Sequence, residues 1–136
     1  MITANKNLVL ADIPGLIAGA SQGRGLGIEF LRHIERCQVL IHLLDGAKLL
    51  TSEVKEVHTS EVLLKDYQAV RNELATYSKS LIEKEEIVVL NKIDVLSAQQ
   101  IKDGLAALKK LKKLVICISA ATHKNLDELK RALEVI

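Results

Sequence analysis

The sequence is poor in aromatic residues, with one Phe, two Tyr and no Trp among 136 residues. RNA-binding surfaces that stack bases on aromatic rings are therefore not expected. No apolar run approaches the roughly 20 residues of a membrane-spanning helix, so no membrane partner is expected. Lys and Arg number 19 against 17 Asp and Glu, spread through helical segments. That balance favours solvated helix faces over a nucleic-acid-binding stripe.

Cysteine is also scarce. Cys37 and Cys117 are far apart in the chain and lack the paired spacing of metal ligands. Both lie in apolar segments, which predicts thiols in the core of a protein kept in the reducing cytoplasm. The length allows one domain at most, and the hydrophobic fraction of 49% is enough to form a core.

The most informative stretch is Ile87-Val88-Val89-Leu90-Asn91-Lys92-Ile93-Asp94, in which four apolar residues run into Asn-Lys-x-Asp. A continuous apolar run predicts a strand buried on both faces of a parallel sheet. The carboxylate of Asp94 can accept from N1–H and the 2-amino group of guanine, a donor pair that adenine lacks. The stem of Lys92 can lie across the base, and Asn91 can tie the loop to its neighbours. A polar turn before a helix is the alternative.

Two further polar stretches also follow apolar runs. Asp12-Ile13-Pro14-Gly15 follows a predicted strand over Leu8 to Ala11, and Ser119-Ala120-Ala121 follows one over Leu114 to Ile118. The Ser119 hydroxyl can hold the carboxylate of Asp94, and the Ala120 amide can donate to guanine O6. A loop-capping Asp12 and a helix-capping Ser119 are the alternatives.

In this order the motifs resemble the DxPG, NKxD and SA signatures of translation-factor-class GTPases. The flanking text ADIPGLIAGASQGRGLG, FLRHIERC and HLLD resembles the Obg family of ribosome-associated GTPases. The resemblance implies GTP or GDP as ligand, Mg²⁺ bound through water at Asp12, and a switch II over residues 15–27 whose Gly15 amide contacts the γ-phosphate. It also implies a role in large ribosomal subunit assembly. Leu16 stands where many GTPases have a water-orienting Gln.

The sequence contains no GxxxxGK[ST] phosphate loop. The resemblance therefore implies that residues 1–136 are a partial GTP-binding domain, without the first strand, phosphate loop, first helix and switch I. The expected fold is α/β, a P-loop-GTPase-like, mostly parallel sheet flanked by helices and incomplete at its N-terminal side. This chain alone is expected to be inactive as a GTPase. The alternative function is a non-catalytic module that contacts a protein or the ribosome.

The missing strand would lie between the predicted strands at Leu8 to Ala11 and Val39 to Leu44. We therefore expect direct pairing of these two strands, a gap, or self-association through exposed sheet edges. His42 is predicted to be a satisfied core histidine. Helices are predicted over Ile28 to Cys37, from about Leu63 to Tyr77, after a Ser97 cap, and after an Asn125 cap.

Overall fold

The computed structural model describes residues 8–12, 35–50 and 60–136. Its centre is a three-stranded parallel sheet in the order β1-β2-β3. The strands are β1 (Val39–Asp45), β2 (Glu85–Asn91) and β3 (Leu114–Cys117). The helices are α2 (Glu61–Tyr77), α3 (Lys79–Ile82), α4 (Ala98–Lys109) and α5 (Leu126–Val135), and the 3-10 turns are η2 (Gly46–Leu50) and η3 (Ile93–Val95).

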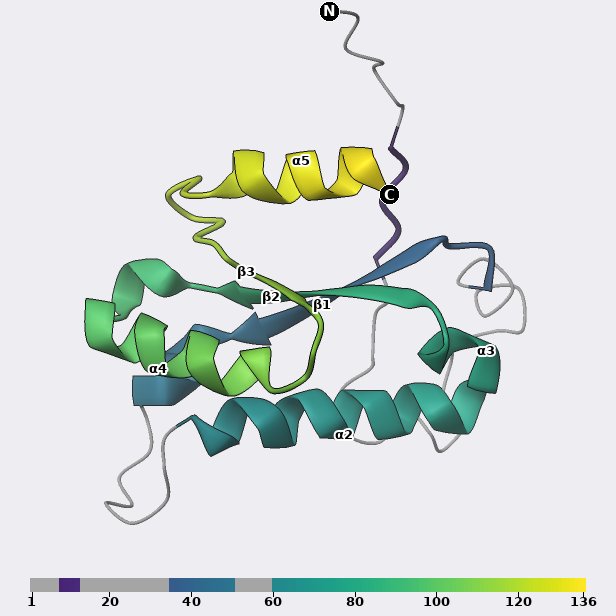
Figure 1. Ribbon diagram of the computed structural model, residues 1–136, viewed down its shortest axis with the longest axis horizontal. Helices are drawn as coiled ribbons and strands as arrows, with labels where there is room; N and C mark the ends of the chain where they lie inside the picture. The colour runs from purple at the N-terminus through teal and green to yellow at the C-terminus, as the bar shows by residue number, and fades with distance from the viewer. Residues whose placement is uncertain (1–7, 13–34, 51–59) are drawn as a thin grey trace, which may run out of the picture.

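Helices cover both faces of the sheet, as expected for parallel strands. Figure 1 shows α5 on one face and α2 with α4 on the other. The central strand β2 is buried on both sides from Glu86 to Leu90, which confirms the interpretation of its continuous apolar run. The prediction of an α/β fold with a parallel sheet is confirmed.

Two apolar layers fill the space between sheet and helices. The layer beneath α2 and α4 is centred on the buried residues Leu63, Val88, Leu90 and Leu108. The layer beneath α5 consists of Ile87, Val89, Ile116 and Ile118, against which the α5 residues Leu126, Leu129, Ala132 and Leu133 pack. Alternate residues of β2 therefore belong to opposite layers. This alternation determines which side chains of the strand point to each face of the sheet.

The two predicted helix caps have different outcomes. Ser97 is the N-cap of α4, where its hydroxyl accepts from the Gln100 amide and the Gln100 side chain accepts from the Ser97 amide. Asn125 occupies the N-cap position of α5, but its side chain makes no capping bond and donates instead to the Cys117 carbonyl at 2.8 Å. The predicted cap is wrong because Asn125 is left-handed, with φ 60°, and its amide group binds the end of β3.

The predicted strand at Leu8 to Ala11 is not found. Residues 8–12 lie outside the three-stranded sheet and are exposed, Val9 by 92%. Direct pairing with β1, one of the three expected outcomes, is therefore excluded. Apolar residues predict a strand locally, but a strand persists only when a neighbouring strand satisfies its backbone, and no described residue pairs with this segment.

Several other expectations fall on undescribed residues. Gly15 and switch II lie in residues 13–34, which also include most of the helix predicted over residues 28–37. Within the described ranges, no helix is both long and apolar enough to cross a membrane.

His42 is buried, as predicted, and belongs to a polar cluster between β1, β2 and α2. Its Nδ1 lies 3.0 Å from Oε1 of buried Glu86, and the Tyr67 hydroxyl donates to Glu86 Oε2 at 2.7 Å. The rings of His42 and Tyr67 are stacked, and Arg71 Nη1 lies 3.5 Å from the same carboxylate. His42 is only half satisfied, since its Nε2 is buried without a hydrogen-bond partner in the described part of the chain.

Burial alone raises the pKa of Glu86, but the hydrogen bonds from His42 and Tyr67 and the charge of Arg71 outweigh it and lower that pKa. Burial, with the Glu86 hydrogen bond, raises the pKa of Tyr67 to about 12. The cluster therefore favours a charged Glu86 and a neutral Tyr67 in the folded chain.

Candidate functional site

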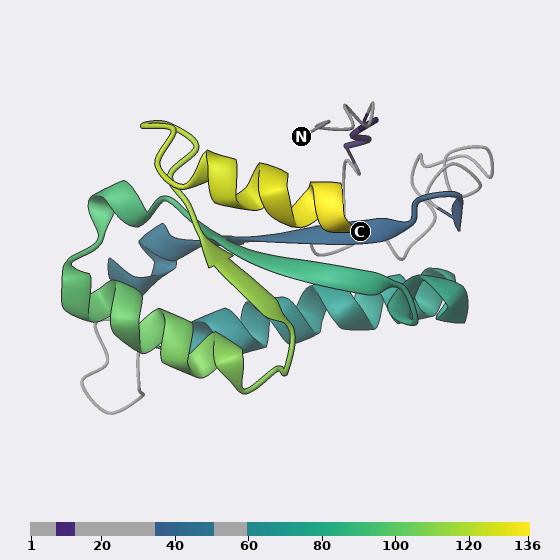
Figure 2. The ribbon, with the colours of Figure 1, turned by 45° about the horizontal axis from the view of Figure 1, so that its top comes forward.

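Three loops meet at the carboxyl edge of the sheet. Because the strands are parallel and Asp45 is in register with Asn91, the loops that follow β1 and β2 start side by side. The loop after β3 joins them through the Ile118 amide, which donates to Leu90 O, and the Ile93 amide, which donates to Ile118 O. Figure 2 shows the β2–α4 and β3–α5 loops at the same end of the sheet. Such edges are where open α/β sheets bind ligands.

Asp94 and Ser119 are in direct contact in this edge. The Ser119 hydroxyl donates to Asp94 Oδ1 at 2.7 Å, as the sequence predicts, and accepts from the Thr122 amide at 3.1 Å. Ser119 is fully buried, whereas Asp94 is exposed. The contact therefore fixes a carboxylate that remains open to a ligand.

Asn91 joins the second and third loops. Its Oδ1 accepts from the Lys92 amide at 2.8 Å and from the Ala120 amide at 3.0 Å. The predicted role of Asn91 in tying the loop to its neighbours is met by these two bonds. The Ala120 amide, predicted to donate to guanine O6, already donates to Asn91 Oδ1. A guanine oxygen would therefore have to share this amide with Asn91 or displace the Asn91 side chain from it. Ala121 follows it as an exposed residue of the loop.

Lys92 points back to the end of β1. Its backbone is left-handed, with φ 65°, and its Nζ donates to Asp45 Oδ2 at 2.7 Å. Asp45 Oδ1 accepts from the Ala47 amide at 2.9 Å, so both carboxylate oxygens are engaged. The hydrogen bond from Lys92 holds the pKa of Asp45 below its usual value. Asp45 was not singled out from the sequence. The signal that could have revealed it is its position directly after the predicted strand over Val39 to Leu44, which pairs with the strand that ends in Asn-Lys-x-Asp.

Gly46 brings the first two loops into close contact. A Cβ at this position would lie 2.6 Å from the Asn91 carbonyl oxygen and 3.0 Å from Leu96 Cδ1. Only glycine therefore allows the end of β1 to approach Asn91 this closely.

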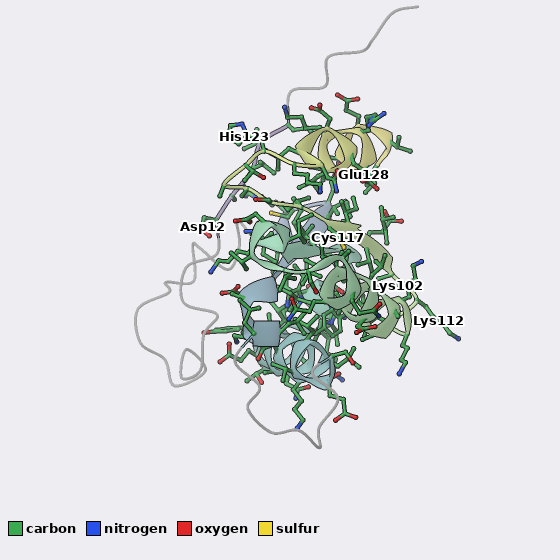
Figure 3. The ribbon with its side chains drawn as sticks, turned by 90° about the vertical axis from the view of Figure 1, so that its left-hand side faces the viewer. Asp12, Lys102, Lys112, Cys117, His123 and Glu128 are labelled. Atoms are coloured by element: carbon green, nitrogen blue, oxygen red, sulfur yellow. The ribbon has the colours of Figure 1, made fainter. Side chains whose placement is uncertain are left out.

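The described residues do not by themselves form a magnesium site. Asp12 is exposed and lies outside the sheet. Figure 3 shows it on the same flank as His123, with Lys102 and Lys112 on the opposite flank. Within residues 8–12, 35–50 and 60–136, no three His, Cys, Asp or Glu side chains are grouped to hold a metal ion. One exposed carboxylate does not match the near-octahedral set that Mg²⁺ requires.

Known proteins match the sequence of this chain. The profile of a family described as "50S ribosome-binding GTPase" matches residues 1–92. GTPase Obg of Rickettsia bellii is 46% identical over 134 residues, and GTPase Obg of Pelagibacter ubique is 44% identical over 130 residues. These matches cover 97% and 95% of this chain but only 37% and 36% of the relatives.

The three-stranded parallel sheet with helices on both faces is consistent with a P-loop-GTPase-like fold. The family profile covers more than half of the chain, and the relatives match nearly all of it. The chain is a member of the 50S ribosome-binding GTPase family, of the Obg type.

Proposed function

We propose that residues 1–136 are the base-recognition part of an Obg-type GTP-binding domain. In this proposal Asp94, Lys92 and Ala120 contact guanine, while Asn91 and Ser119 hold them in place. The observation that carries the proposal is the 2.7 Å hydrogen bond from Ser119 to Asp94, because it orients an exposed carboxylate at the ligand-binding edge of a parallel sheet.

The chemistry selects guanine over adenine. An ionised carboxylate accepts two hydrogen bonds in parallel, and guanine presents N1–H and the 2-amino group side by side. Adenine carries an unprotonated N1 at the corresponding edge, which would face the Asp94 oxygens as one acceptor against another. Lys92 adds an aliphatic stem for the ring, with its ammonium held at Asp45.

The remaining parts of the proposal come from the resemblance to Obg GTPases. They are GTP and GDP as ligands, the Gly15 amide as a γ-phosphate contact, and Mg²⁺ at Asp12 with further ligands from the nucleotide. The partner is the large ribosomal subunit during its assembly, in the cytoplasm. Self-association through open sheet edges belongs to the same proposal, since an unpaired strand edge is a template for another chain.

A second candidate is a non-catalytic module that binds a protein or the ribosome. The observation in its favour is that the sequence has no GxxxxGK[ST] motif, the usual source of phosphate contacts. The two candidates differ in what they require of the carboxyl edge. Only the first needs Asp94 to meet a base.

Base recognition is testable by NMR titration of the 136-residue chain with guanosine, inosine and adenosine. We expect guanosine to shift the amide signals of Lys92, Asp94 and Ala120, inosine to bind more weakly because it lacks the 2-amino group, and adenosine to leave them unchanged. Equal effects of guanosine and adenosine, or shifts confined to other parts of the chain, would refute guanine recognition at this edge and favour the interaction module.

A further inference from the structure

The end of β1 contributes a side chain to the base-recognition edge, although its residues belong to none of the three motifs. Asp45 Oδ2 accepts from Lys92 Nζ at 2.7 Å, across 47 positions of sequence. The Ala47 amide holds the other carboxylate oxygen at 2.9 Å, so Asp45 is itself fixed by its own loop. We propose that Asp45 is a positioning residue for the purine base, acting through Lys92.

The backbone around this pair supports the proposal independently. Lys92 adopts a left-handed conformation with φ 65°, which is unfavourable for residues other than glycine. The Asn91 side chain accepts from the Lys92 amide, and the close approach of Gly46 to the Asn91 carbonyl keeps β1 beside this turn. These contacts direct the lysine side chain toward Asp45, although that side chain stays half-exposed.

Fixing the ammonium also restrains the four-carbon stem. A free lysine side chain samples many rotamers, and ordering it when a ligand binds costs free energy. With Nζ held at Asp45, part of that cost is met before the base arrives. Asp45 therefore acts on the aromatic ring of the ligand rather than on its phosphates.

The inference rests on the proposed function. Whether Asp45→Asn weakens or strengthens ligand binding distinguishes a positioning role from a purely electrostatic effect. Replacing Asp45 by Asn removes a negative charge near an anionic ligand and releases the Lys92 ammonium. Electrostatics alone predicts tighter binding of GDP. Loss of positioning predicts weaker binding, roughly two- to fivefold for an exposed pair of this kind, and the same factor for uncharged guanosine.

The test is NMR titration of wild type, Asp45→Asn and Asp66→Asn with guanosine and with GDP, and of wild type with adenosine. Asp66→Asn is the matched control, because it removes a partly exposed carboxylate that contacts Lys48 instead. The Lys92 side-chain methylene signals report the ring directly, since protons stacked on a base move upfield. A thermal melt of each variant checks that the fold is unchanged.

We expect upfield Lys92 signals in wild type and Asp66→Asn, reduced in Asp45→Asn, with the dissociation constant (Kd) raised for both ligands. If wild type binds guanosine but Asp45→Asn binds it equally well, or binds GDP more tightly, the positioning role is wrong and guanine recognition stands. If wild type does not distinguish guanosine from adenosine, the proposed function fails and the positioning role fails with it.

Discussion

The hydroxyl of Ser119 donates to the carboxylate of Asp94 at 2.7 Å, although the two residues are 25 positions apart. Ser119 is fully buried and also accepts the Thr122 amide, so its orientation is set by the β3–α5 loop. The carboxylate proposed to recognise the base is thus oriented by a different strand end. Changes to either residue should therefore weaken base binding.

Asp94→Asn should change the preferred base. The substitution turns one acceptor into a donor, which suits xanthine, whose C2 carries an oxygen in place of the guanine amino group. NMR titration should show guanosine binding lost and xanthosine binding gained, with a loss for guanosine of about 2 kcal/mol. Unchanged guanosine affinity would show that Asp94 does not contact the base.

Ser119→Ala should weaken guanosine binding more modestly. The Asp94 carboxylate keeps its charge but loses the hydrogen bond that orients it, a contribution of about 1 kcal/mol and therefore roughly fivefold in Kd. Thr76→Ala is a suitable control, because it removes an exposed hydroxyl of α2 that donates to the Asn72 carbonyl of the same helix. If both variants bind guanosine as wild type does, the Ser119 contact has no role in recognition.

Gly46→Ala should destabilise the chain by about 1–3 kcal/mol, because the new Cβ would lie 2.6 Å from a backbone oxygen that cannot move aside cheaply. Gly104→Ala is the control. Its Cβ would meet only leucine methyl groups at 3.3 Å, and alanine is the better residue within α4. Chemical denaturation of the two variants compares them, and equal stabilities would contradict the close packing at Gly46.

Stability should fall at acid pH partly through Glu86. Because folding lowers the pKa of this carboxyl, the folded chain binds its proton less tightly than the unfolded chain. The resulting stabilisation is complete above the ordinary value of 4.5 and is lost as the pH falls below it. Unfolding free energies measured across this range should therefore depend less on pH in Glu86→Gln than in wild type. A parallel dependence would exclude Glu86 as a contributor.

The sequence predicts the features of this chain that depend on local pattern. The two-sided burial of Ile87 to Leu90 follows from an apolar run, and the Ser97 cap follows from its position before an amphipathic helix. The Ser119–Asp94 contact was also predictable, because both residues follow strands of one expected parallel sheet, whose carboxyl ends lie at the same edge.

The features that escaped prediction depend on non-local geometry. The Asp45–Lys92 pair requires the β1–β2 register and a left-handed Lys92, neither of which is visible in composition. Leu8 to Ala11 has a strand-like pattern but no described pairing partner. Glu86 lies at the start of a buried strand. Its burial is explained by the hydrogen bonds that His42 and Tyr67 make to its carboxylate, and the sequence does not reveal those contacts.

We propose that this chain recognises guanine without the contacts of a GxxxxGK[ST] phosphate loop. One charge-assisted pair of roughly 1.5–3 kcal/mol and two lesser contacts of about 1 kcal/mol each sum to roughly 3.5–5 kcal/mol. That sum corresponds to a Kd near the millimolar range before ordering costs are subtracted.

Calorimetric titration of the 136-residue chain with Mg·GTP and Mg·ATP measures this affinity directly. We predict binding no tighter than about millimolar for GTP, weaker binding for ATP, and no hydrolysis above buffer. Micromolar binding or turnover would show that other residues supply phosphate contacts, and equal affinity for the two nucleotides would refute guanine recognition.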